Sequence, residues 1–407
     1  MSTDETIAVI GSGPAGLAAA LALRAVGKPV KIYERYASPK PAGNILNLWP
    51  PSIKALECLG VDVDDIGAPC ESTFRNHRDR LRADVHISED VVRAYGGGFI
   101  GLLRPDLFTR MLAALPDETL VGEHEVASFE DHGDHVEVRF IDGTSVRTPL
   151  LVGADGINST VRRKLLGEAP MREHNLHVIG GYTFDVPDGV DTRKAIIRHS
   201  RTVQGSYTGV RSDGRDGAEW WFVEAMDPAA PAPTSLHEHS IELAKEFPAD
   251  LQQLVARTDP AHVIRWPIRD RGVPPREWAR GRVVLAGDAV HATSPYAAYG
   301  AGMSIVDGYF LGQVLATTDL SDTAAVEAAL QTYQAHRVDH CSDQVAQAYM
   351  LGRTFHHTPA ILRPIRDFML DRTPFLQKQV GDKNPAEINA QLGLMGRDLF
   401  HPAKARA

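Results

Sequence analysis

The sequence has little cysteine and no long apolar run. Its 407 residues include 3 cysteines, which are widely separated and form no CxxC pair, so a disulfide scaffold and a cysteine-based zinc site are excluded. No apolar stretch reaches the ~18–20 residues that span a membrane. The first five residues carry acids where a signal peptide needs positive charge. We therefore expect a cytoplasmic protein without a membrane span.

Positive charge and metal-binding patterns are scarce as well. The chain carries 43 basic and 52 acidic residues, a formal net charge of -9 with neutral histidine. Without a cluster of Lys and Arg, a nucleic-acid partner is disfavoured. The 17 histidines show no HExxH or comparable spacing, so no metal site is expected.

Three short apolar runs, residues 7–10, 150–152 and 283–285, each end in a turn that contains glycine. This pattern is typical of buried parallel strands whose carboxyl ends form a ligand-binding edge. Strand-like pieces across residues 176–225, separated by Gly/Asp turns, instead predict an antiparallel sheet. Residues 324–352 carry apolar positions at near-helical spacing and predict one long amphipathic helix.

Two shorter segments also predict local structure. Residues 120–147 alternate between apolar and polar side chains and break at Asp142-Gly143, which predicts a hairpin. Residues 228–233 are rich in Ala and Pro and predict a surface loop. At this length we expect two or three domains.

A glycine-rich motif, Gly11-Ser-Gly13-Pro-Ala15-Gly16, lies between the first predicted strand and an Ala/Leu-rich helix. In such a motif the first glycine permits a tight turn, the second admits a pyrophosphate, and the third lets helix and strand pack closely. Glu34 ends the second predicted strand, 18 residues after Gly16. A carboxylate there binds a ribose 2′-hydroxyl and repels a 2′-phosphate, so the site should hold FAD or NAD and not NADP.

A later motif favours FAD. Gly287-Asp288 follows the third apolar run and leads into a loop that ends at Gly300-Ala301-Gly302, where a helix over residues 303–315 is predicted. A second helix N-terminus is rich in hydrogen-bond donors and suits the pyrimidine edge of a flavin. The Asp288 carboxylate can accept hydrogen bonds from a ribityl chain.

Three segments together resemble the fingerprints of the single-component (group A) FAD-dependent aromatic hydroxylases, which include salicylate and para-hydroxybenzoate hydroxylases. They are residues 11–16 with Glu34-Arg35, residues 151–162 and residues 281–291. Their order and spacing match, and the likeness extends from about residue 6 to about residue 355. The resemblance implies an α/β fold: a Rossmann-like FAD-binding domain, an inserted antiparallel-sheet substrate domain and a C-terminal helical region. The expected boundaries are 1–75, 100–170 and 275–345 for the first, 76–99 and 171–274 for the second, and 346–407 for the third.

The resemblance also implies roles for single residues. Glu34 and Arg35 would contact the ribose and adenosine side of FAD, Arg104 would reach the FAD, and Val126 would lie beside the adenine. Asp155 would serve both FAD and a transient nicotinamide cofactor. The remaining cofactor-binding residues would be Gly11, Gly13, Ala15 and Gly16 at the diphosphate, Asp288 at the ribityl chain, and Gly300, Ala301 and Gly302 at the isoalloxazine.

The flavin loop departs from the family pattern. Ala298 stands where the family often has glycine, which adds a Cβ beside the flavin. Gly302 stands where many members have Asn. Pro39-Lys-Pro41 replaces a more usual Arg-containing approach to Gly43.

The chemistry implied by the resemblance is monooxygenation. In the family scheme NADH or NADPH reduces the flavin, which binds O2 as a C4a-hydroperoxide and transfers one oxygen atom to a small aromatic or polycyclic substrate. The protein excludes solvent and holds the substrate, while the cofactor carries the oxygen chemistry. No catalytic side chain is assigned, and we expect His291 to be structural.

The substrate should lie between the flavin loop and the antiparallel sheet. Arg198 is a candidate partner for a substrate carboxylate or phenolate, and Tyr207 for a hydroxyl. The full set of candidate lining residues is Asn47, Tyr182, Arg198, Tyr207, Trp221 and Tyr296.

Other functions on the same fold stay open. These are a flavin-dependent epoxidase, halogenase, reductase or oxidase, although the halogenase signature Trp-x-Trp-x-Ile-Pro is absent. A non-catalytic FAD-fold binding protein, similar to the escort proteins of prenylated GTPases, is disfavoured because all three cofactor motifs are retained. The sequence leaves open the substrate, the choice between NADH and NADPH, and the oligomeric state.

Overall fold

The first apolar run and its glycine-rich turn build the edge of a parallel sheet. Strand β1 (Ile7–Ile10) pairs directly with the parallel strand β2 (Val30–Tyr33), and the helix α1 (Pro14–Ala25) connects the two strands. The six strands follow the order β17-β18-β11-β1-β2-β7, and all pairs are parallel except β17–β18. The three predicted apolar runs lie side by side, as β18, β11 and β1, so their glycine turns meet at one sheet edge. The other bounds are β7 (Leu120–Val121), β11 (Leu151–Gly153), β17 (Ala279–Arg280) and β18 (Val283–Leu285).

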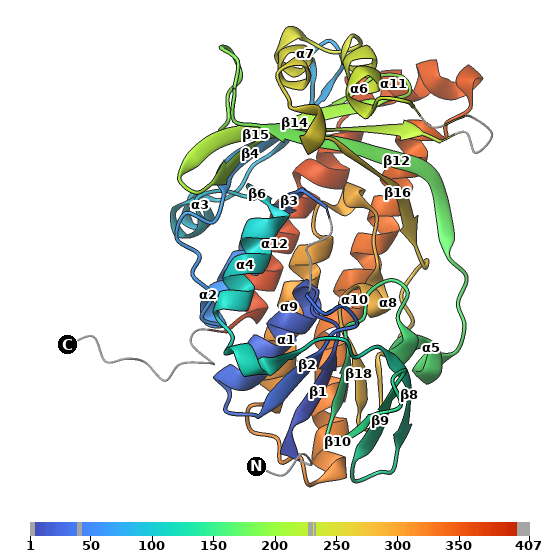
Figure 1. The fold of residues 1–407 in the computed structure, drawn as a ribbon. Helices are drawn as coiled ribbons and strands as arrows, with labels where there is room; N and C mark the ends of the chain where they lie inside the picture. The colour runs from blue at the N-terminus through green and yellow to red at the C-terminus, as the bar shows by residue number, and fades with distance from the viewer. Residues whose placement is uncertain (1–4, 39–42, 227–230, 232, 397–407) are drawn as a thin grey trace.

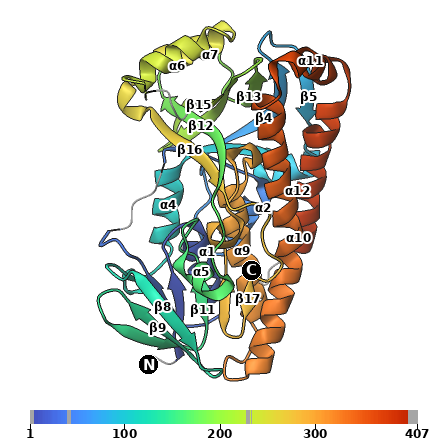
Figure 2. The ribbon, with the colours of Figure 1, turned by 90° about the vertical axis from the view of Figure 1, so that its right-hand side faces the viewer.

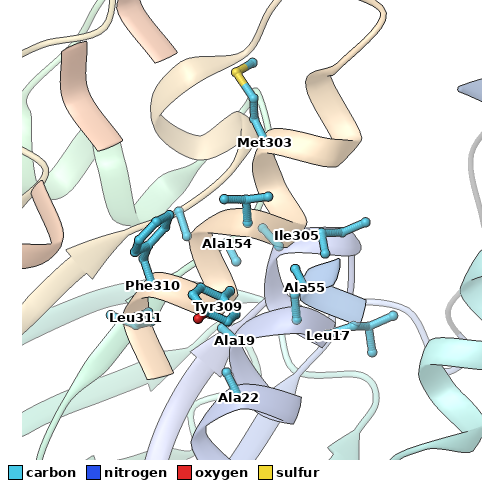
Figure 3. Packing of buried hydrophobic residues seen from close by; sticks show 14 of the residues in the cluster. Leu17, Ala19, Ala22, Ala55, Ala154, Met303, Ile305, Tyr309, Phe310 and Leu311 are labelled. Atoms are coloured by element: carbon cyan, nitrogen blue, oxygen red, sulfur yellow. The ribbon is translucent and has the colours of Figure 1, made fainter. Parts of the chain in front are cut away.

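Helix α9 (Gly300–Leu315) packs directly on α1 (Figure 3). Alanines such as Ala19 and Ala22 face the larger Tyr309 and Phe310 in this core. A Cβ added to Gly308 would lie 2.5 Å from the backbone carbon of Ala18, so only glycine permits this close approach. The contact positions the start of α9 over the sheet edge.

A nine-stranded sheet forms the other end of the molecule (Figure 1). Eight of its strands follow the order β16-β12-β15-β14-β13-β4-β6-β3, and β5 pairs with β4. All of its pairs are antiparallel except β13–β4. The bounds are β3 (Ile45–Leu48), β4 (Ala68–Asn76), β5 (Leu81–Val85), β6 (Phe99–Leu103), β12 (Arg172–Thr183), β13 (Lys194–His199), β14 (Gln204–Ser212), β15 (Arg215–Ala225) and β16 (Ile264–Asp270).

The strands predicted within residues 176–225 are thus confirmed, but the sheet also recruits β3 to β6 from the first quarter of the chain. Part of this recruited region lies in the range expected for the FAD-binding domain. Short strands separated by helices carry no sequence signal for the sheet they will join, because that pairing is long-range.

The predicted long helix is α10 (Thr323–His356), which runs past both sheets (Figures 1 and 2). It continues unbroken through residues 345 and 346, where a boundary was expected, so the C-terminal region shares a helix with the preceding domain. The proposed domain limits stay a prediction. Of the later helices, α11 (Arg363–Arg372) lies at the end of the nine-stranded sheet, and the π-turn η6 (Gln377–Gly381) and α12 (Lys383–Leu394) lie beside α10 (Figure 2).

The remaining elements cover these layers. The predicted hairpin at Asp142-Gly143 is confirmed as the turn of a three-stranded sheet, β8 (Val126–Asp131), β9 (Val136–Phe140) and β10 (Ser145–Thr148). Among the described residues no helix is both long and apolar enough to cross a membrane. The other helices are α2 (Pro50–Cys58), α3 (Glu89–Tyr95), α4 (Arg104–Ala113), α5 (Thr160–Leu166), α6 (Leu236–Ala244), α7 (Ala249–Ala256) and α8 (Asp288–His291), with single 3₁₀ turns η2 (Asp117–Thr119), η3 (Pro260–His262), η4 (Pro295–Ala297) and η5 (Ala360–Leu362).

This architecture comes from a computed structural model that describes residues 5–38, 43–226, 231 and 233–396. Most of the loop predicted at 228–233, and the Pro39-Lys-Pro41 segment, lie outside the described residues.

Candidate active site

A cavity of about 650 Å³ extends from the carboxyl edge of the parallel sheet to the nine-stranded sheet. We call its two parts the turn end and the sheet end. The turn end is lined by the turns after β1, β2, β11 and β18, through residues such as Gly11, Glu34, Asp155 and Asp288. The sheet end is lined from the nine-stranded sheet, α10, η6 and α12, through Gln204, Trp221, Gln347 and Asn384 among others.

Glycine is required at two positions of the first turn. Gly11 has a φ of 98°, and a Cβ there would lie 2.5 Å from the carbonyl oxygen of Ala154. A Cβ on Gly16 would lie 1.9 Å from the carbonyl oxygen of Gly11, which explains why helix and strand pack closely only with glycine. A Cβ on Gly13 would meet no protein atom within 4 Å, and Gly13 lines the cavity. The turn therefore presents bare backbone to a ligand at the N-terminus of α1.

Glu34 lies where the sequence placed it, at the end of β2 and in the cavity wall. Its carboxylate accepts hydrogen bonds from the Ser12 backbone N–H at 3.0 Å, the Ser12 hydroxyl at 2.7 Å and the Tyr36 N–H at 3.2 Å. These bonds hold the carboxylate against the glycine-rich turn. Arg35, Arg104 and Val126 line the same part of the cavity.

Asp155 caps the following helix while it lines the cavity. Its carboxylate accepts hydrogen bonds from the Ser159 hydroxyl and from the backbone N–H groups of Thr160 at 2.7 Å and Val161 at 3.2 Å. Burial raises the pKa of Asp155, and these bonds oppose that rise. In the motif at residues 151–162, Asp155 therefore caps the helix α5 and so fixes the conformation of the turn after β11.

A buried ionic network supports the turn after β18. Asp307 of α9 accepts hydrogen bonds from the Gly287 N–H at 2.8 Å and the Arg337 Nε at 2.7 Å, and it pairs with the His291 Nε2 at 2.6 Å. Burial opposes ionisation of Asp307, but the charges and hydrogen bonds of His291 and Arg337 lower its pKa to about 2. This network gives His291 the structural role expected of it and positions Asp288 at the cavity.

The loop before α9 also faces the cavity. Ala298 adopts left-handed backbone with a φ of 48°, which explains why glycine is common at this position in the resembling family. Tyr299 supplies no side-chain cap to α9, so the first N–H groups of the helix, at Gly300 and Ala301, lie open at the cavity wall. Thr293 lines the cavity too, and its hydroxyl is buried without a protein partner.

Gly16 and Gly302 are not among the residues that line the cavity. A Cβ on Gly302 would lie 2.4 Å from the Ser52 hydroxyl and 2.5 Å from the Tyr299 ring. The small size of Gly302 therefore serves the packing of α9 against α2, and its expected role at the cofactor stays a prediction. The same contacts leave no room for a larger side chain such as Asn at this position.

These features fit FAD. The open approach at Gly13, the helix N-termini of α1 and α9, the Glu34 carboxylate and the unpartnered Thr293 hydroxyl are donors and acceptors for a dinucleotide and a flavin ring. Glu34 and Arg35 would hold the ribose side, the Gly11–Gly16 turn the diphosphate, Asp288 the ribityl chain, and the Gly300-Ala301 N–H groups the flavin.

The sheet end differs in character. Its walls are aromatic and aliphatic, with amide side chains between them. Among the described residues that line it from the nine-stranded sheet, α10, η6 and α12, none carries an ionised side chain. Its principal lining residues are Phe74, Phe99, Val178, Ile197, Gln204, Trp221, Val223, Trp266, Gln344, Gln347, Leu351, Val380, Asn384 and Ile388.

Three of the six predicted substrate residues line the cavity, namely Asn47, Trp221 and Tyr296. Tyr296 projects from the turn η4, and its hydroxyl contacts the His356 Nε2 at the end of α10. Asn47 of β3 donates a 2.8 Å hydrogen bond to Glu219 of β15. The first contact links the loop before α9 to α10, and the second links β3 to β15.

The other three predictions need correction. Arg198 lies on the opposite face of β13 from the cavity-lining Ile197, where it bonds Asp79 at 2.8 Å and Asp250 at 2.7 Å. Tyr207 lies on the far face of β14 and is packed in a separate core with Phe247. Tyr182 stacks on His262 with ring centroids 4.3 Å apart, outside this cavity. Side chains alternate along a strand, so a shift of one residue moves a candidate to the other face.

Sequence reasoning missed the amides and one buried acid. Gln344 and Gln347 lie one helical turn apart on α10, within the predicted amphipathic helix, and both are buried. Polar residues that continue the apolar face of that helix were the available signal. Glu219, 0% exposed, shares the face of β15 with Trp221 and precedes the apolar run at residues 220–223. A lone acid at the start of such a run was a second signal.

Comparison with known proteins places this site in a family. The family described as "FAD binding domain" matches residues 4–348. Aurachin C monooxygenase/isomerase of Stigmatella aurantiaca is 32% identical over 367 residues, which cover 87% of this chain and 90% of that protein. The 6-hydroxynicotinate 3-monooxygenase of Pseudomonas fluorescens is 29% identical over 84% of this chain and 90% of its own length.

A solved structure agrees with both. Klebsiella pneumoniae HpxO, complexed with FAD and uric acid, superposes with a TM-score of 0.79 at 25% identity, covering 95% of this chain and 97% of that one. The fold and the turn end define a flavoprotein of the FAD-binding α/β class. The chain belongs to the single-component FAD-dependent aromatic hydroxylases, a family of flavoprotein monooxygenases.

Proposed function

We propose that the chain is an NAD(P)H- and FAD-dependent monooxygenase that inserts one oxygen atom of O2 into a small aromatic or polycyclic substrate. The observation that carries the proposal is the continuity of one cavity from the glycine-rich turn to the aromatic sheet end. FAD held by the residues of the turn end would share this cavity with a substrate held by the residues of the sheet end. Bound FAD, once reduced, would supply the activation of O2.

The chain's own residues would hold and orient the cofactor and would shield the reacting centre from water. The glycine-rich turn and Glu34 would hold the adenosine half of the cofactor, and the N-terminus of α9 would provide backbone donors to the flavin. Trp221, Trp266 and Leu351 form apolar walls that exclude water from the reacting centre. No described side chain at the sheet end is an obvious base, in keeping with chemistry carried by the cofactor.

The test is substrate-stimulated oxidation of NADH or NADPH by the FAD-loaded protein, coupled to mass spectrometry under ¹⁸O₂. The expected result is a product that gains one ¹⁸O atom, with the second atom recovered in water. An epoxide or its diol would indicate the epoxidase alternative, and hydrogen peroxide without product an oxidase. A protein that binds FAD but is not reduced by either nicotinamide cofactor would contradict the proposal.

A further inference from the structure

The polar side chains that line the sheet end are uncharged. Besides the Asn47 amide of β3 and the Ser72 hydroxyl of β4, they are the amides of Gln204 on β14, Gln344 and Gln347 on α10, and Asn384 on α12. The charged lining residues are at the turn end or beside it. Arg104, on the first turn of α4, donates its Nε to the Ile45 carbonyl at 3.2 Å and lies over Gly43.

Two of these amides have their orientation fixed by the protein. The Gln347 Nε2 donates to the Gln379 carbonyl at 2.9 Å, and the Gln204 Nε2 donates to the Ser206 hydroxyl at 3.1 Å. The remaining Oε1 of Gln347 is buried without a hydrogen-bond partner, whereas the Gln204 side chain also interacts with the buried His199 imidazole beside it. Buried acceptors are rarely left unpaired, and a ligand N–H or O–H would satisfy them.

The nearby cations are tied or neutral. Arg198 lies on the far side of the sheet between two aspartates, as described above. His199 and His356, which pack against Tyr296, are both buried. Burial, with the neighbouring charges of Arg82 and Arg366, lowers the pKa of His199 well below its usual value. Burial lowers the pKa of His356 to about 4, so neither imidazole is charged at neutral pH.

A carboxylate that entered the sheet end would therefore lose its hydration without gaining a cation with which it could form an ion pair. Transfer of an ion into such surroundings is strongly unfavourable, whereas a neutral ring with one or two donors meets apolar walls and open acceptors. The aromatic faces of Trp221 and Trp266 suit a planar ring.

We propose that the sheet end selects uncharged, planar aromatic or heteroaromatic compounds that donate a hydrogen bond to Gln347, and that it discriminates against aromatic carboxylates. This inference rests on the proposed function, because it names the substrate class of the same site.

The experiment uses pairs of compounds that differ by one carboxylate, with the FAD-loaded enzyme at pH 7.5. Suitable pairs are 4-quinolone and 4-quinolone-2-carboxylate, indole and indole-2-carboxylate, and phenol and salicylate. Dissociation constants come from the perturbation of the flavin absorbance spectrum. We expect the neutral member to bind at least about tenfold more tightly in each pair. Equal or tighter binding of the carboxylates, or no binding by any neutral donor, overturns the proposal.

Two variants test the role of the amides. 4-Quinolone carries a single N–H donor, so Gln347→Leu should weaken its binding by about fivefold to tenfold, the effect of one hydrogen bond, and Gln204→Leu should have a smaller effect. Binding of 1-methyl-4-quinolone, which lacks the N–H donor, should change less. The control is Gln313→Leu on α9, which also removes a buried, unpartnered amide oxygen but lies outside the cavity lining. Similar loss for both quinolones in Gln347→Leu would contradict donor recognition, and FAD content and thermal melting report whether each variant folds.

The two proposals fail separately. If neutral compounds bind tightly but none gains oxygen, the proposed function is wrong and the selectivity stands. If aromatic carboxylates bind preferentially and are oxygenated, the function stands and the selectivity is wrong.

Discussion

The two ends of the cavity are built on different physical grounds. The turn end consists of short turns in which backbone conformation, glycine and ionised side chains decide the shape, as at Gly11 and Asp307. The sheet end consists of side chains from strands and helices far apart in the chain, and its polar groups are amides such as Gln204 and Gln347. The comparison shows that a cofactor site can be conveyed by local motifs, while a substrate site depends on the packing of distant elements.

The difference between the two ends is tested most strongly by removing the charge that supports the turn end. Asp307→Asn leaves His291 and Arg337 buried without their counter-ion, which should cost about 3–5 kcal/mol of unfolding free energy. The measurement is urea unfolding of the FAD-free protein at pH 7. Because the pKa of Asp307 is lowered to about 2, its stabilisation is present above the pKa of about 4 of an unfolded Asp. The gap between wild type and variant should therefore shrink as pH falls from about 4 toward 2.

The control for that variant is Asp339→Asn, which removes an ion pair of similar length at the surface. The Asp339 and Arg276 side chains are 2.7 Å apart but 81% and 79% exposed. Such pairs contribute little. An Asp307→Asn variant no less stable than this control would mean that the buried network does not support the turn end.

Gly13→Ala tests whether the turn end is shaped for a ligand and not for the protein alone. The added Cβ meets no protein atom, so the stability of the FAD-free protein should be unchanged. The same Cβ enters the approach of the diphosphate, and FAD affinity should fall about 10-fold to 100-fold, or about 1.4–2.7 kcal/mol. Fluorescence titration of FAD measures this. Gly16→Ala should instead impair folding, since its Cβ would lie 1.9 Å from a carbonyl oxygen.

The same contrast explains which predictions from the sequence succeeded. The three apolar runs, the glycine turns, the hairpin at Asp142-Gly143 and the long helix α10 are encoded by neighbouring residues, and each is present. The expected positions of Glu34, Asp155 and Asp288 at one cavity follow from strand ends that meet at one sheet edge.

The substrate residues could not be predicted equally well. Arg198 and Ile197 are neighbours in sequence but lie on opposite faces of β13, and only the paired sheet decides which face meets the cavity. Glu219 of β15 and Asn47 of β3 form a hydrogen bond although they are 172 residues apart in the sequence. No local pattern reports such a contact.

Glu219→Gln examines the buried acid that accepts a hydrogen bond from Asn47 beside the sheet end. Burial raises the pKa of Glu219 well above its usual value, and the hydrogen bond from Asn47 and the charge of Arg104 offset this only in part. A carboxyl with a raised folded-state pKa stabilises the fold most below the unfolded pKa of about 4.3 and loses that stabilisation as pH rises. The variant should therefore become more stable relative to wild type between pH 4.5 and pH 8, by about 1–2 kcal/mol, the scale of a buried unsatisfied group.

Glu224→Gln on the same strand is the matched control, with the opposite sign. Burial opposes ionisation of Glu224, but hydrogen bonds from His177 and His239 lower its pKa. It stabilises the fold above the unfolded pKa, so this variant should be less stable than wild type at neutral pH. Thermal melting across the pH range measures both. Parallel pH profiles for the two variants would show that the environments of Glu219 and Glu224 do not differ as the geometry requires.

The smallest expected effect comes from Ala298→Gly in the loop before α9. Left-handed backbone costs an alanine about 1 kcal/mol relative to glycine, while glycine loses more entropy on folding, so the two effects nearly cancel. The net stabilisation should be at most about 1 kcal/mol, read from the same urea titration. A control at Ala297, which precedes it in the turn η4 without a positive φ, should lose stability on the change to glycine. If both variants lose stability equally, the left-handed conformation of Ala298 is not the constraint, and the turn end is less governed by backbone geometry than the comparison holds.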